Sequence, residues 1–134
     1  MKIRVSLGQT LAQAVLADLA SGAGTDPVME IYTGNMPASL GNTITDTLLA
    51  TFVLSSTVGT ESNGVITFSG WTNEDSAPDG GDAGWARLLN KSGEEVIYLS
   101  AGGSGSGAAV IVSPETVVAN EPVNLTSGVI RMPV

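Results

Sequence analysis

The first regular pattern along the chain is a helical repeat of apolar positions near the N-terminus. Apolar side chains recur every fourth residue at Leu7, Leu11, Val15 and Leu19. This spacing places them on one face of an α-helix. Ser6 and Gln9 have the spacing of a capping box, and Gly22 is a stop signal. We therefore predict one helix over residues 7–21, preceded by an arm of residues 1–5, with an apolar face buried on a sheet or against a neighbouring chain.

After residue 27 the pattern changes to short runs of alternating apolar and polar residues, which are typical of β-strands. The clearest run carries Leu48, Ala50, Phe52 and Leu54 on one face. Asn63-Gly64 is a strong signal for a hairpin turn. The expected strands are residues 29–33, 47–55, 65–69, 84–90, 95–100, 108–113, 123–126 and 129–132.

Turn signals recur about every 8–12 residues between these runs, as in β-sandwiches and jelly rolls. We predict a single domain over residues 1–134 that is mainly β. Residues 28–134 are expected to form an antiparallel β-sandwich or jelly roll, and the N-terminal α-helix is expected to pack beside it.

Composition removes several classes of function. The 134 residues include no cysteine and no histidine, so thiolate sites, Cys-His pairs and Ser-His-Asp triads are not available. Charged residues make up 13% of the chain and its net charge is −8. A protein that binds phosphate backbones needs the opposite balance, so we expect no nucleic-acid partner. The longest apolar stretch is too short for a membrane span.

Two loops offer candidate chemistry. Residues 73–82 contain Asn73, Glu74, Asp75, Asp79 and Asp82. Calcium favours oxygen-rich loops, but the EF-hand spacing is missing, so we interpret the loop as solvated and leave calcium binding open. Residues 103–108 match the G-x-G-x-x-A pattern literally, but strand-like residues follow where a dinucleotide fold needs a helix. We therefore expect no cofactor, no metal ligand and no catalytic residue.

Carboxylates and aromatic residues also favour a structural role. Glu94 and Glu95 are adjacent, so on a strand they point to opposite faces and cannot act together on one bond. Trp85 and Arg87 are two residues apart on the strand expected at 84–90, so their side chains lie on the same face. We interpret Trp85 as an anchor of the core or of an interface, and Arg87 as a buried or interfacial cation.

Several motifs in combination resemble a known class of proteins. They are MEIYTGNMP at residues 29–37, LLATFVL at 48–54, NGVITF at 63–68, GWAR at 84–87 and VNLTS at 123–127. Together, after a short helix, they resemble small virion structural proteins of tailed bacteriophages. The resemblance implies a non-enzymatic capsid cement or decoration protein that stabilises the head through protein–protein contacts. A tail or neck component of the phage is one alternative, and a calcium- or carbohydrate-binding β-sandwich module is another.

A virion role sets the expected partners. They are further copies of the chain, as a homo-oligomer, and other virion proteins such as the major capsid protein, with no membrane involved. The protein would be made in the host cytoplasm and reside in the virion. The candidate interface residues are Ile3, Val5, Leu7, Leu11, Val15, Trp85, Arg87, Val129 and Met132.

Overall fold

One α-helix and eleven β-strands follow each other in the computed structural model, which describes residues 1–134. The helix, α1, spans Val5–Leu19. The strands are β1 Val28–Tyr32, β2 Leu48–Leu54, β3 Gly59–Ser62, β4 Val65–Phe68, β5 Trp71–Thr72, β6 Gly81–Asp82, β7 Trp85–Leu89, β8 Glu95–Gly102, β9 Val110–Ser113, β10 Thr116–Val117 and β11 Asn124–Arg131.

The helix is confirmed, but its predicted ends are wrong by two residues. It begins at Val5 because the amide of Gly8 already donates to the carbonyl of Arg4, at 3.0 Å. Ser6 therefore lies inside the first turn, and its hydroxyl accepts from Arg4 Nε instead of capping the helix. The predicted capping box does not form, and Val5 belongs to the helix, not to the arm. At the other end the helix stops at Leu19, before Gly22.

The predicted fold class, mainly β with one N-terminal helix, is confirmed. Nine strands form one sheet in the order β3-β4-β11-β9-β8-β7-β1-β2-β5, and β10 pairs with β6 in a small second sheet. All pairs are antiparallel except β8 and β9. The runs expected at 123–126 and 129–132 are one strand, β11, because an irregularity between Leu125 and Ser127 lets the strand continue past the turn signal.

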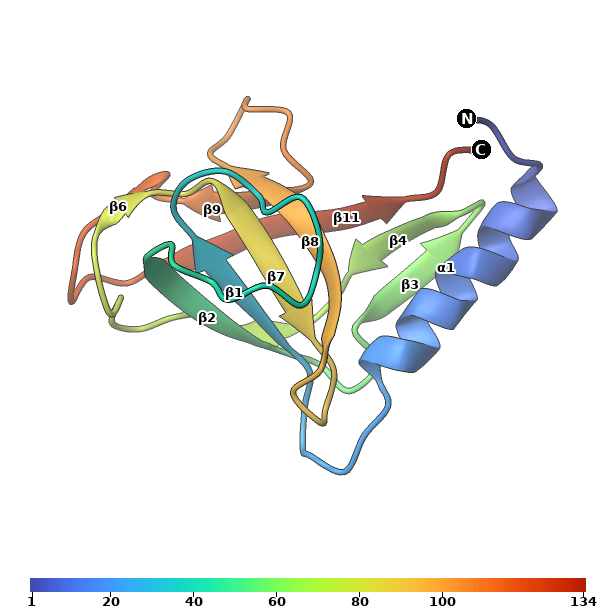
Figure 1. Cartoon of the computed structure of the whole chain (residues 1–134), viewed down its shortest axis with the longest axis horizontal. Helices are drawn as coiled ribbons and strands as arrows, with labels where there is room; N and C mark the ends of the chain where they lie inside the picture. Colours follow the sequence, from blue (N-terminus) through green and yellow to red (C-terminus); the bar gives the residue numbers. More distant parts are fainter.

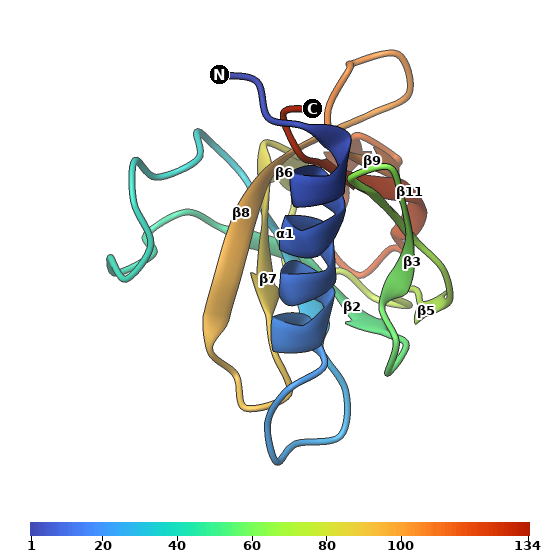
Figure 2. The ribbon, with the colours of Figure 1, turned by 90° about the vertical axis from the view of Figure 1, so that its right-hand side faces the viewer.

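The large sheet curls, which gives the fold its sandwich-like shape (Figure 1). Val58 and Ile66, at one end of the sheet, share a cluster of 22 buried residues with Phe52, near the other end. The helix closes the open side of this curl, between β8 and β3 (Figure 2). Its residues Ala12 and Leu19 belong to the same cluster.

The hairpin between β3 and β4 has the turn that its sequence predicts. Asn63 and Gly64 both have positive φ angles, 52° and 84°. Two left-handed residues in succession define the turn that matches the twist of a two-residue hairpin. Asparagine and glycine tolerate this conformation better than other residues.

The helix that packs beside this hairpin is not long and apolar enough to cross a bilayer, and the structure contains no helix that is.

Candidate functional site

The outer side of α1 carries apolar side chains that the sheet leaves uncovered. Val5, Leu7 and Leu11 are 46%, 37% and 41% exposed. The buried face of the helix instead consists of Gly8, Ala12 and Leu19. Val15 lies partly buried against the core. The predicted apolar stripe is therefore only partly buried. Val15 and Leu19 pack on the core, whereas Leu7 and Leu11 lie at the border of the buried face and remain exposed.

The side of the helix on which Leu7 and Leu11 lie follows from the helical rotation and from the contact of Gln13 with β3. Each residue of an α-helix turns the direction of the side chain by about 100°. Gln13 contacts Glu61 of β3 through a hydrogen bond of 3.2 Å. By this rotation Leu7 and Leu11, one turn apart, lie on the flank opposite Gln13. Figure 2 shows β8 on the other side of the helix from β3. We call these two leucines the helix flank.

The two chain ends meet beside the start of the helix. The amide of Ile3 donates to the carbonyl of Pro133 at 2.8 Å, and a Cβ added to Gly8 would lie 2.3 Å from Val134 Cγ1. Met132 packs against the core, and Val129 is half-buried. The predicted arm and C-terminal strand are therefore brought together, next to the helix flank.

Trp85, in contrast, is fully buried within the chain. Its ring stacks on Tyr32 at 4.8 Å and meets the edge of Tyr98 at 4.9 Å. Its Nε1 donates to Thr33 O and to Asp46 Oδ2, at 3.1 and 3.0 Å. These aromatic residues project from the outer face of β1, β7 and β8, opposite the main core. Trp85 therefore anchors a second small core and presents no surface to a partner.

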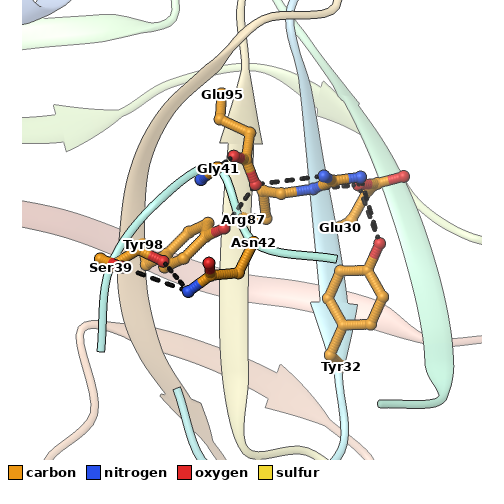
Figure 3. Close-up of polar contacts among 8 residues, drawn as sticks. All are labelled: Glu30, Tyr32, Ser39, Gly41, Asn42, Arg87, Glu95 and Tyr98. Atoms are coloured by element: carbon orange, nitrogen blue, oxygen red, sulfur yellow. Dashed lines mark hydrogen bonds and ion pairs between the residues drawn. The ribbon is translucent and has the colours of Figure 1, made fainter. Parts of the chain in front are cut away.

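Arg87 lies on the same face and joins two carboxylates (Figure 3). Its guanidinium is 2.7 Å from Glu30 and 3.2 Å from Glu95. Burial alone would lower the pKa of Arg87, but the hydrogen bonds to both carboxylates outweigh it and the net shift is upward. The hydroxyl of Tyr98 donates to Glu95 and, more than any other contact, lowers the pKa of that carboxyl. Arg87 is therefore an internal cation.

The loop between β1 and β2 covers this network. Gly41 N donates to Glu95 Oε1 at 2.8 Å, and Ile44 packs on the aromatic cluster. In Figure 1 the loop crosses in front of β1, β7 and β8. No motif in the sequence singled out Glu30, Tyr32 or this loop as parts of the network. A signal was present in the sequence: Glu30 and Tyr32 are a charged and an aromatic residue two positions apart, as Trp85 and Arg87 are. On neighbouring antiparallel strands such residues can lie opposite one another, charge to charge and ring to ring.

Four of the five oxygen-bearing side chains of the acidic loop accept hydrogen bonds from the protein itself. Asn73 accepts from the amide of Leu125, and Glu74 accepts from the amide of Thr51. Asp79 accepts from the amide of Gly80, and Asp82 accepts from the hydroxyl of Thr116. No three acidic side chains of the structure converge as metal ligands would. Asn73, Asp75, Asp79 and Asp82 are exposed, as expected of a solvated loop, and the loop is also tied to β2 and β11.

Comparison with protein-family models, with curated proteins and with solved structures gives no match.

Removing the cation of the network should destabilise the fold. We expect Arg87→Leu to lower the free energy of unfolding by about 1–3 kcal/mol, because Glu30 and Glu95 keep their burial but lose their charged partner. Chemical denaturation followed by circular dichroism measures the change. Arg131→Leu is the matched control, since Arg131 is exposed and has no ion pair. Equal effects of the two substitutions would contradict the role of the network.

Alkaline pH should destabilise the fold through Tyr98. Burial, together with the hydrogen bond to Glu95, raises the pKa of Tyr98 from 10.0 to about 12. Its contribution to stability is fully present below pH 10 and is lost as pH rises toward 12. We expect denaturation midpoints to fall across this window, and to fall less in Tyr98→Phe. An ultraviolet titration in which both tyrosines of the folded chain ionise near pH 10 would contradict this assignment.

Proposed function

We propose that the protein is a non-enzymatic structural protein of a tailed-phage virion, a cement or decoration protein that stabilises the head. It would bind further copies of itself and other virion proteins, such as the major capsid protein. The observation that carries this proposal is the exposed apolar helix flank beside the paired chain ends. Leucine side chains this exposed gain about 1 kcal/mol or more each when a partner covers them.

The internal polar groups support a structural role. No buried side-chain nitrogen or oxygen lacks a hydrogen-bond partner. Arg87 is held between two carboxylates, so it is not free to bind a substrate. The shifted pKa values belong to this same network, whose groups stabilise one another. Such an arrangement favours a rigid scaffold, since a catalytic group needs an accessible atom that is not already paired.

The acidic surface suits the outside of a capsid. With a net charge of −8, the chain is repelled by packaged nucleic acid and is not drawn to phosphate. The calcium alternative has less support, because Asn73 and Glu74 already accept from backbone amides. The carbohydrate alternative also has less support, because Tyr32, Trp85 and Tyr98 are buried and offer no stacking platform.

Mass spectrometry of purified particles tests the proposal. Phage particles are induced from a strain that carries the gene, purified on a density gradient, and separated into heads and tails. We expect the chain in the head fraction at a copy number comparable to that of the major capsid protein. Recovery with tails would favour the tail or neck alternative. Absence from intact particles, with the chain abundant in the lysate, would overturn the virion role.

A further inference from the structure

The large sheet has a gap between β8 and β11 in which no strand lies. β9 joins these two strands, but it pairs with β8 only at Ala101 and Gly102 and its ladder with β11 ends at Gly128. Before β9 the chain turns away in the loop of residues 103–109 (Figure 1). Residues 97–100 of β8 and 129–131 of β11 therefore line the two sides of a gap.

The strand edges on both sides direct main-chain groups into this gap. Ala101 N donates to Gly84 O beside β7, at 3.2 Å. Since alternate residues of a strand bond to opposite neighbours, Tyr98 points its N–H and C=O away from β7. On the other side, Val129 N donates to Ala109 O, on the β9 side of β11, at 3.0 Å. Arg131 is two residues further along β11, so its N–H and C=O also point to this side, into the gap.

The gap is a groove with an apolar lining. Its volume is about 650 Å³, and its walls include Ile97, Leu99, Ala108 and Val129. Where β9 is present, β8 and β11 lie two strand spacings apart, about 9.6 Å. The groove continues the line of β9, so its natural occupant is one extended strand of about four residues. Strand addition of this kind uses main-chain hydrogen bonds for affinity and side-chain pockets for specificity.

Charge identifies the kind of strand that fits. Arg131 is the one charged residue of the groove lining, and neither of the two ion pairs of the structure involves it. A carboxylate on the incoming segment would pair with it. A second copy of the chain is a poor source, because its two edge strands do not fit. β5 has only two residues, and the carboxylate of β3, Glu61, already accepts from Gln13 and from the amide of Gly64.

We propose that the groove between β8 and β11 binds an extended segment of a different protein, with small apolar residues followed by a carboxylate. The segment would run between Tyr98 and Arg131 as an added strand. This inference rests on the proposed function only for the source of the segment, a neighbouring virion protein. The groove itself can be tested with the isolated chain, so the two proposals can fail separately.

Titration with a synthetic peptide tests the groove. The probe is the capped pentapeptide Ac-Thr-Val-Ala-Val-Glu-NH2, added to the full chain labelled with nitrogen-15. We expect saturable NMR shifts at the amides of Tyr98, Ser100 and Arg131. Methylating alternate peptide nitrogens removes the donors of the ladder and should weaken binding about tenfold. Replacing Glu by Gln should weaken binding about two- to fivefold at low salt.

Variants of the chain complete the experiment. Ala108→Tyr places a large side chain in the groove and should abolish binding, whereas Ala119→Tyr, at an exposed loop position, should not. Arg131→Gln should remove the preference for Glu over Gln. Absence of shifts at the groove amides at millimolar peptide, or equal binding of the methylated peptide, would overturn the proposal. Dimerisation that Ala108→Tyr abolishes would overturn the choice of a foreign segment and assign the groove to a second copy.

Discussion

Replacing Trp85 by alanine is expected to lower the free energy of unfolding by about 3–5 kcal/mol, the usual range for a buried aromatic residue. The ring is fully buried and contacts Tyr32 and Tyr98 in both stacked and edge arrangements. Its loss leaves a cavity beneath the β1–β2 loop. It also leaves Thr33 O and Asp46 without the indole donor. Urea denaturation followed by circular dichroism measures the difference by linear extrapolation.

The second tryptophan provides the control for this measurement. Trp71 is half-buried at the edge strand β5 and packs on the main core. We expect Trp71→Ala to cost less, because part of its surface is already in water in the folded state. Trp85→Phe separates the two contributions of Trp85, since it keeps most of the apolar volume and removes only the donor. A loss for Trp85→Ala no larger than that for Trp71→Ala would show that the aromatic cluster contributes little.

Local patterns explain why most elements were predictable. The period of the N-terminal repeat predicts α1, and the alternation at residues 48–54 predicts β2, because both reflect which face meets the core. The Asn63-Gly64 turn depends on two backbone conformations that few residues adopt. The sheet order was not predictable, since the parallel pairing of β8 with β9 and the position of β11 beside β4 depend on distant contacts.

The network of Glu30, Arg87 and Glu95 beneath the β1–β2 loop could not be predicted from local patterns. Glu30 and Arg87 are opposite charges on neighbouring strands, but only the register of β1 with β7 brings them together. The β1–β2 loop looked like an ordinary connection in the sequence. Its role depends on the amide of Gly41 reaching Glu95 from 54 residues away. The apolar arc of α1 was equally ambiguous, since a wide arc does not show which leucines the sheet covers.

The helix flank is the surface on which assembly is expected to depend most. We predict that the double substitution Leu7→Gln and Leu11→Gln weakens self-association about 30- to 1,000-fold, since each leucine contributes about 1–2 kcal/mol when buried at an interface. Both side chains are partly exposed, so the fold should remain stable. Glutamine keeps the net charge unchanged, which separates the loss of apolar contact from electrostatic repulsion.

Sedimentation velocity over a range of concentrations measures this effect, and the content of the variant in purified particles measures it in the virion. Ala17→Gln is the matched control, because Ala17 is an exposed residue of the same helix and lies on a different side from the flank. A double variant that assembles and enters particles like the unsubstituted chain would remove the flank from the interface. The paired termini beside it would then be the next surface to alter, since Ile3 and Pro133 bond to each other and neither belongs to the buried core.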